Sequence, residues 1–293
     1  MVAVVGMLLA LALAGPVSAQ VDCSNPDNLC TGDPCVIPAL EVGPNCVVDF
    51  GARAVVVAGN LHVTNVLDLS ALSFVVDGRI VGGVDVQLTA TAAVDIRNAI
   101  KTSGITLEAG PAMLTVAGRL RAASGVRLTS GGGVTVLKPV RARFTGIRIE
   151  AVDDIDVLAP LVASTTMGSG DVTLEAGGVI TIMRSIYTDS RYPFGSGGYA
   201  VIRGDSGVVV GPGVLFSARH SQLAGGVVVE SSAGDVSFDA RVHASAAQDG
   251  GSLEIDGQNV TTHLAMVANG GYMAGRPPRE LSRRRRERRP LGR

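Results

Sequence analysis

Apolar and polar residues alternate in short triplets over most of this chain, and the apolar residues show no helical spacing. The stretch "SGDVTLEAGGVITIMRSIYTDS", residues 169–190, holds three such triplets separated by turn residues. In an extended strand the outer residues of a triplet lie on one face and the middle residue lies on the other. The pattern therefore predicts three short strands, each with one apolar face.

The three-strand unit recurs along the chain. A second triplet follows the first after seven to nine residues, and a third follows six or seven residues later. The first triplets of successive units lie 19 to 28 residues apart and begin at Val86, Ile105, Val126, Ile147, Val172, Ala200, Val227 and Leu253. Two looser units precede them at residues 46–63 and 66–81. A fixed repeat of this length is typical of solenoids, in which each unit covers the apolar face of its neighbour.

We therefore predict an all-β protein that forms a right-handed, single-stranded parallel β-helix (β-solenoid) over residues 46–271. About ten turns of three short strands stack with their outer triplet residues inward, and glycine-rich corners such as residues 131–133 allow the bends. At about 4.8 Å per strand the rod is roughly 48 Å long. A stacked β-sandwich is the alternative, but it requires antiparallel hairpin turns that the three-strand period does not supply.

The two ends of the sequence differ from the repeats. Residues 1–19 form an apolar run that ends in a small-x-small sequence, which predicts a cleaved secretory signal peptide. Residues 20–45 are predicted to be a disulfide-rich cap on the first turn. Four cysteines, Cys23, Cys30, Cys35 and Cys46, indicate two disulfides in an oxidising compartment, and three pairings are open. Their spacing lacks the close pairs that zinc sites use.

Residues 272–293 form an arginine-rich tail that we expect to be disordered and dispensable for folding. From Arg276 onward it carries nine Arg and two Glu, whereas the whole chain of 293 residues has a net charge of −1. Attraction of anionic surfaces by charge alone is the alternative role for this tail. Because the prolines and charges after the last repeat make a poor cap, a truncated or frame-altered version of a longer repeat protein is a second interpretation of this end.

The segments "GDVTLEAGGVITI" and "SGVRLTSGGGVTVLKPVRA" resemble the haemagglutinin-type repeats of large bacterial filamentous adhesins. The resemblance covers roughly residues 47–271. It implies a right-handed parallel β-helix, the fold of these secreted adhesins. The asparagine-proline signatures of that family's secretion domain have only a loose echo in "SNPDNL", so the resemblance carries the fold and not the secretion route.

Composition and motifs give little sign of catalysis. Hydrophobic residues make up 46% of the chain and aromatic residues 3%, so the core must be aliphatic. Parallel β-helices also include polysaccharide lyases and hydrolases, and Asp153, Asp154 and Asp156 form the densest acidic cluster for such acid-base work. A solvated corner is the simpler interpretation of this cluster. The four histidines are scattered over different turns, and we expect no catalytic set, metal site or cofactor.

One set of outward residues is a candidate binding face. The middle residues of successive third triplets place cations and then aromatic or imidazole groups in one column. They are Lys101, Arg121, Arg141, Val162, Tyr187, Phe216, His243 and Val267. Like charges in neighbouring strands repel unless an anion or a carboxylate partner lies nearby. The column is therefore either a binding face or a set of long side chains that pair with Glu108 or Glu150.

These observations predict a secreted or cell-surface, non-catalytic structural or adhesive protein of bacterial type. Its rod would present its faces to extracellular glycans or other cell-surface components. A lyase or hydrolase that acts on acidic glycans is the alternative. The sequence predicts no specific nucleic-acid partner and no transmembrane segment, because the N-terminal apolar run is shorter than the ~20 residues that a span needs.

Overall fold

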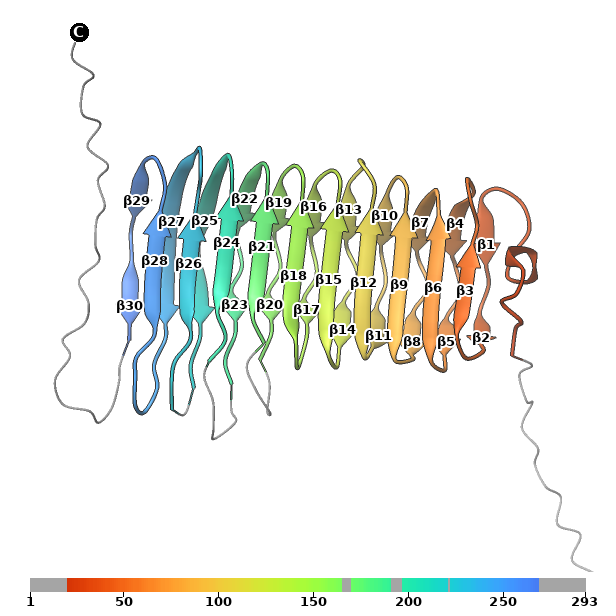
Figure 1. The fold of residues 1–293 in the computed structure, drawn as a ribbon, viewed down its shortest axis with the longest axis horizontal. Coiled ribbons are helices and arrows are strands. Elements are labelled where there is room, and N and C mark those ends of the chain that lie inside the picture. Colours follow the sequence, from red (N-terminus) through yellow and green to blue (C-terminus); the bar gives the residue numbers. More distant parts are fainter. Residues whose placement is uncertain (1–19, 165–169, 191–196, 221, 269–293) are drawn as a thin grey trace, which may run out of the picture.

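The chain folds into a parallel β-solenoid of about 11 turns (Figure 1). The computed structural model describes residues 20–164, 170–190, 197–220 and 222–268. The regular elements within these residues are strands, apart from the short 3-10 helix η1 (Pro26–Asn28). The predicted all-β parallel β-helix is confirmed, with about one turn more than expected. The predicted signal peptide and arginine-rich tail lie outside the described residues.

The first triplets form one continuous sheet of ten strands, most of them five or six residues long. We call its outward side the long-strand face. Its strands are β3 (Cys46–Asp49), β6 (Val66–Ala71), β9 (Asp85–Ala90), β12 (Gly104–Ala109), β15 (Gly125–Ser130), β18 (Gly146–Ala151), β21 (Val172–Ala176), β24 (Ala200–Gly204), β26 (Gly226–Glu230) and β28 (Ser252–Asp256).

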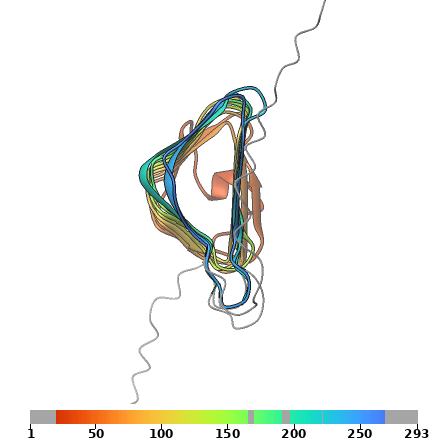
Figure 2. The ribbon, with the colours of Figure 1, turned by 90° about the vertical axis from the view of Figure 1, so that its left-hand side faces the viewer.

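The second and third triplets form two further stacks, whose outward sides we call the second-strand and third-strand faces. The second stack comprises β1 (Cys35–Ile37), β4 (Ala54–Val57), β7 (Ser73–Val76), β10 (Val94–Ile96), β13 (Leu114–Val116), β16 (Val134–Val136), β19 (Ile155–Val157), β22 (Val179–Ile182) and β29 (Val260–Thr262). The third comprises β2 (Leu40–Val42), β5 (Leu61–Val63), β8 (Ile80–Gly82), β11 (Ile100–Thr102), β14 (Leu120–Ala122), β17 (Val140–Arg141), β20 (Leu161–Val162), β23 (Ile186–Tyr187) and β30 (Ala265–Val267). Two long strands, β25 (Gly207–Ser217) and β27 (Asp235–His243), turn the corner and belong to both stacks. Figure 2, which looks along the axis, shows the resulting three-sided outline.

Up to the last described turn, each strand pairs in parallel with the equivalent strand of the next turn, and the inward residues stack in register. In β9, for example, Val86 and Leu88 are fully buried while Gln87 between them is not. Val86 pairs with Ile105 of β12, which pairs with Val126 of β15. Aliphatic side chains therefore fill a continuous column, because each turn removes the apolar face of its neighbour from water.

Tight stacking at the corners requires glycine at particular positions. A Cβ atom on Gly118 would overlap the backbone carbonyl oxygen of Asn98 in the preceding turn. Gly146 has a φ of 95°, a conformation that L side chains rarely adopt. The corners thus approach one another more closely than any residue with a side chain would allow.

The N-terminal end of the column is covered. The segment with η1 lies across this end (Figures 1 and 2), and Leu29 and Cys30 beside it are buried. Disulfides join Cys23 to Cys46 and Cys30 to Cys35, which settles the pairing. The strands begin at Cys35, so β1 and β2 lie within residues 20–45, the segment predicted to be the cap.

The placement of Phe216 differs from the sequence prediction. In the turns before and after β25, the inward residues on either side of the corner are four positions apart, as in Ile182 and Ile186 or Phe238 and Val242. In β25 the inserted Gly-Pro-Gly separates Val210 from Phe216 by six positions and shifts the register. Phe216 is therefore 1% exposed and stacks on Phe238 with ring centroids 5.4 Å apart. The prediction that Phe216 lies outward on the binding face is wrong.

Candidate anion-binding surface

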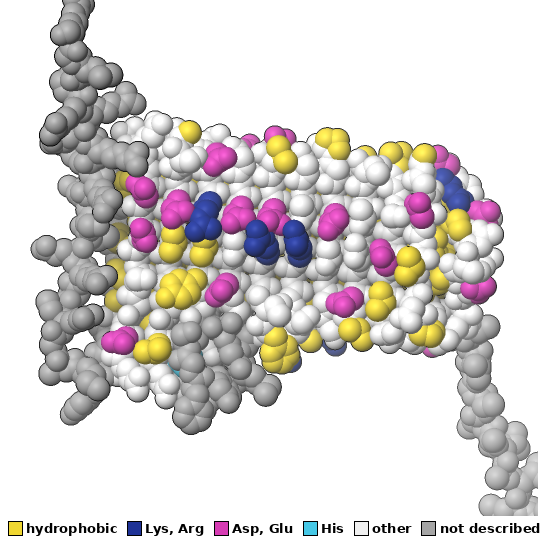
Figure 3. Space-filling view, in the orientation of Figure 1, with side chains coloured by type: hydrophobic (Ala, Val, Ile, Leu, Met, Phe, Trp, Pro, Cys, Tyr) yellow, Lys and Arg dark blue, Asp and Glu magenta, His cyan; other side chains and the backbone are white. Residues whose placement is uncertain are grey.

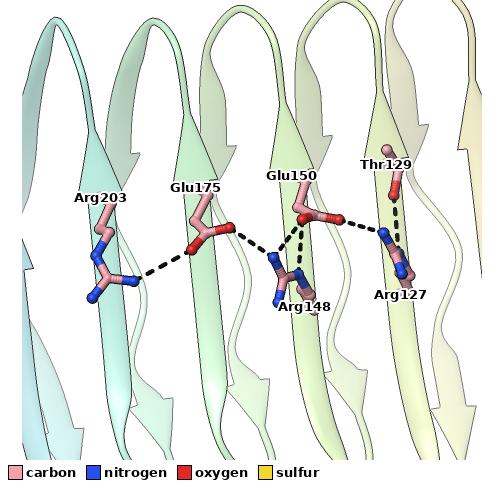
Figure 4. A network of polar contacts seen from close by, with 6 residues as sticks. All are labelled: Arg127, Thr129, Arg148, Glu150, Glu175 and Arg203. Atoms are coloured by element: carbon pink, nitrogen blue, oxygen red, sulfur yellow. Dashed lines mark hydrogen bonds and ion pairs between the residues drawn. The ribbon is translucent and has the colours of Figure 1, made fainter.

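Six charged side chains on the long-strand face neutralise one another. They lie on five consecutive strands, from β15 to β26, and we call them the charge ladder: Arg127, Arg148, Glu150, Glu175, Arg203 and Glu230. Figure 3 shows a row of mixed charges on this face, and Figure 4 draws the ladder without Glu230. Glu150 accepts from Arg127 at 2.9 Å and from Arg148 at 2.6 Å. Arg148 also reaches Glu175 at 2.9 Å. Three Arg and three Glu leave the ladder without net charge.

The ladder continues toward the C-terminal turns through Arg203. Its guanidinium lies 3.4 Å from Glu175 and 2.6 Å from Glu230. The hydrogen bond from Arg148 holds the pKa of Glu150 below its ordinary value, and the charges of Arg148 and Arg127 add to this effect despite partial burial. The pKa of Arg148 and that of Arg203 are raised in turn, chiefly by their hydrogen bonds to Glu150 and Glu230. These groups are charged and mutually satisfied at neutral pH.

The third-strand face, by contrast, carries cations that form no ion pair with a described carboxylate. Lys101 of β11, Arg121 of β14 and Arg141 of β17 pair in register on adjacent strands, and we call them the cation row. All three side chains are exposed. Successive cations are about 4.8 Å apart at the backbone. Among the described residues no carboxylate forms an ion pair with any of them, and neither Glu108 nor Glu150 contacts them.

The described cations fall into a paired and an unpaired set. The ion pairs involve Arg53, Arg97, Arg127, Arg148, Arg203 and Arg219. The other described Lys and Arg residues lie on the third-strand face or at its two corners and have no ion pair to a described residue. They are Arg79, Lys101, Arg119, Arg121, Lys138, Arg141, Arg143, Arg184 and Arg241. Among the described residues, cations without an ion pair are therefore confined to the third-strand face and its two corners.

Beyond the cation row the third-strand face is hollowed. Tyr187 of β23, Ser217 of β25 and His243 of β27 follow one another in register. Ser217 is 2% exposed and donates to Asp189 at 2.6 Å, so its small side chain lies below those of its two neighbours. Beside this column lies an open, shallow groove of about 490 Å³, which we call the Tyr187 groove. It is lined by Ser185, Tyr187, Gly213, Leu215, Arg241, Val242, His243, Ala265 and Val267.

The groove follows from the same register shift that buries Phe216. The Gly-Pro-Gly insertion moves Leu215 beside Arg241, where it is only partly buried, and brings Ser217 into the outward column. His243 is fixed by a contact of 3.1 Å between its Nε2 and the hydroxyl of Ser245. One wall is therefore aromatic and the other carries an imidazole and a guanidinium.

The structure brings the residues of the predicted face together, except that Ser217 takes the place of Phe216 in the outward column. Lys101, Arg121, Arg141, Tyr187 and His243 share the outward column of the third stack, with Val162 between Arg141 and Tyr187, whereas Phe216 does not. Sequence reasoning missed Arg119 and Arg241, which stand directly before the triplets. Residues two positions apart in a strand share a face, so Arg119 could have been added from its spacing to Arg121.

The acidic cluster lies elsewhere. Asp156 faces outward on β19 of the second stack, and Asp153 and Asp154 are at the corner before it. The carboxylate of Asp154 accepts from the backbone N–H of Val179 at 2.6 Å, so it fixes the corner of the next turn. Within the described residues no three His, Cys, Asp or Glu side chains are placed to hold a metal ion.

The fold defines the class of this protein as a parallel β-solenoid repeat protein. Searches against protein-family models, curated proteins and solved structures return no match for the chain. No helix among the described residues is both long and apolar enough to span a membrane.

Proposed function

We propose that this chain is a secreted, non-catalytic β-solenoid with a structural or adhesive role, whose third-strand face binds anionic extracellular partners. The resemblance to haemagglutinin-type repeats, the two disulfides and the apolar N-terminal run support secretion and adhesion. The rod holds its outward residues at a fixed spacing, so a surface of this kind presents a regular array of charge to a partner.

The distribution of cations carries the proposal. Within the described residues, the arginines of the long-strand face are paired, while the cations of the third-strand face stand in register without a carboxylate. Three like charges on adjacent strands destabilise a sheet. A function in anion binding explains why Lys101, Arg121 and Arg141 occupy these positions, since a bound polyanion removes the repulsion and gains charge-assisted hydrogen bonds.

The proposal is tested with inorganic polyphosphate as a generic polyanion and the full chain as protein. A variant with Lys101→Ser, Arg121→Ser and Arg141→Ser loses three exposed charge contacts of about 0.5 kcal/mol each, so its Kd rises about tenfold. The matched control removes three charges from the tail with Arg283→Ser, Arg284→Ser and Arg285→Ser. Fluorescence anisotropy measures both, and equal losses in the two variants would contradict the proposal.

A single substitution separates binding from a purely structural role of the row. Arg121→Glu places a carboxylate between Lys101 and Arg141, and opposite charges on adjacent strands stabilise a sheet by about 0.2–1 kcal/mol per pair. We expect the variant to be more stable than the native chain in urea unfolding and to bind polyphosphate more weakly. A variant that lost stability would indicate that the native row contributes to folding instead.

A further inference from the structure

We propose that the natural ligand class of the third-strand face is an unbranched acidic polysaccharide with one carboxylate on each sugar, a polyuronide. It lies along the solenoid axis, with carboxylates on the cation row and one sugar ring in the Tyr187 groove. This inference rests on the proposed function and narrows it from polyanions in general to one chemical class.

The spacing of the cations supports a ligand with one charge per repeat. The row supplies one cation per turn at about 4.8 Å, which is close to the length that one pyranose ring adds to an extended chain. Arg121 and Arg141 can each bind a carboxylate with two parallel hydrogen bonds. Because these two side chains have no ion pair to a described residue, binding does not require an existing salt bridge to break.

The Tyr187 groove adds a feature that a simple polyanion cannot use. Tyr187 and His243 are two strand spacings apart, about 10 Å, with the small Ser217 between them. The groove runs beside these residues, over the partly buried Leu215. The C–H face of a sugar ring is apolar and packs on an aromatic side chain, while its hydroxyls and carboxylate reach Arg241 and His243. Mostly apolar walls with a few polar groups are the usual composition of small-ligand sites.

The groove and the row form one continuous site. From Lys101 to His243 the outward column runs over seven consecutive strands, β11 to β27, and six spacings give roughly 29 Å. Val162 is the one residue between Arg141 and Tyr187. A single tyrosine in this column fits a sugar better than single-stranded nucleic acid, whose sites stack successive bases on several aromatic side chains.

The experiment compares oligogalacturonate with inorganic polyphosphate of equal charge, using the full chain. Tyr187→Ala should weaken oligogalacturonate binding about threefold to tenfold, the range expected for a lost ring contact, and should leave polyphosphate binding unchanged. Tyr199→Ala is the matched control, because Tyr199 is 44% exposed and precedes β24 on the long-strand side. The triple Lys101, Arg121 and Arg141 variant should lose affinity for both ligands.

The outcomes separate the two proposals. If neither ligand binds the native chain, the proposed function fails. If both bind through the cation row but Tyr187→Ala has no selective effect, the proposed function stands and the polyuronide inference is overturned. Tighter binding of single-stranded oligo(dT) with the same dependence on Tyr187 would also overturn it. Shortening of the oligogalacturonate during incubation would contradict the non-catalytic role.

Discussion

Glu150 is a bridging residue of the charge ladder, because its carboxylate pairs with both Arg127 and Arg148 and so offsets the repulsion between them. Arg127 and Arg148 are in register on β15 and β18, so their guanidinium groups are adjacent. Both donate to Glu150, whose side chain is 23% exposed. The arrangement inverts that of the cation row, where neighbouring cations have no such acceptor.

Glu150→Gln should destabilise the protein by about 1 kcal/mol at pH 7, since two ion pairs of this exposure contribute about 0.2–1 kcal/mol each. The pKa of Glu150 is lowered in the folded state, so its contribution is present above the unfolded pKa of about 4.3 and is lost as the pH falls through the folded pKa. The difference between variant and native chain should therefore shrink below about pH 4. Urea unfolding at pH 7 and pH 3 measures it.

Glu108 provides the control for this prediction. It lies in the same outward column of the long-strand face, two strands before Glu150, and has no ion pair to a described residue. Glu108→Gln should change the free energy of unfolding little at either pH. An equal loss at pH 7 and pH 3 for Glu150→Gln would mean that packing, and not charge, accounts for the effect.

At the residue scale the sequence predicts which side chains face outward wherever the triplets are evenly spaced. Lys101, Arg121 and Arg141 were placed correctly because period-two alternation decides the face of a strand. The partners of charged residues were not predictable in the same way. Glu150 is a possible partner for the third-strand cations by sequence, but it lies on the long-strand face and pairs there with Arg127 and Arg148.

At the scale of the strand, β25 marks the limit of the triplet pattern. With the Gly-Pro-Gly insertion before Val214, the sequence of the next triplet is compatible with either Leu215 or Phe216 facing inward. Burial of the larger aromatic ring against Phe238 decides in favour of Phe216. This choice depends on contacts between turns, which a single repeat does not contain. The Tyr187 groove depends on the same choice and could not be predicted from the sequence.

The first turn, β1 to β3, should depend on the disulfide between Cys23 and Cys46. It closes a loop with a sequence separation of 23 residues and anchors the capping segment to β3. Its removal by Cys23→Ala and Cys46→Ala should cost about 3 kcal/mol. Cys30 and Cys35 are only 5 positions apart, so the corresponding double variant should cost about 1 kcal/mol less by loop entropy. Denaturant unfolding without reductant compares the two.

Loss of this disulfide should also promote association between molecules. When the cap is released, the outer edge of β1 and β2 is uncovered and β2 loses its bridge from Val42 to Val21. An exposed strand edge favours association between molecules. Light scattering of the Cys23 and Cys46 variant should therefore rise more steeply with protein concentration than that of the native chain. Native-like stability and scattering in this variant would contradict a capping role for residues 20–34.

At the scale of the whole molecule, the central turns of the solenoid are covered on both sides, whereas the last described turn is covered on one side only. Central strands such as β15 have a neighbour on both sides, β12 and β18. The terminal strands β28, β29 and β30 pair on one side only with described strands, and the side chains of β29 and β30 are exposed throughout. Stability in such arrays is approximately a sum of nearest-neighbour contributions.

Two substitutions that shorten a side chain by a similar amount should therefore destabilise different numbers of turns. Leu128 is fully buried in β15, and Leu128→Ala should cost about 2–5 kcal/mol and raise amide hydrogen exchange on both sides of the central turns. Ile255 lies in β28 and is only partly buried, so Ile255→Ala should cost less. Its effect should stay within β26 to β30, because the turns before them keep all of their own contacts. Hydrogen exchange followed by mass spectrometry resolves the two cases. Uniform loss of protection over all turns in Ile255→Ala would mean that the solenoid unfolds as a single cooperative unit.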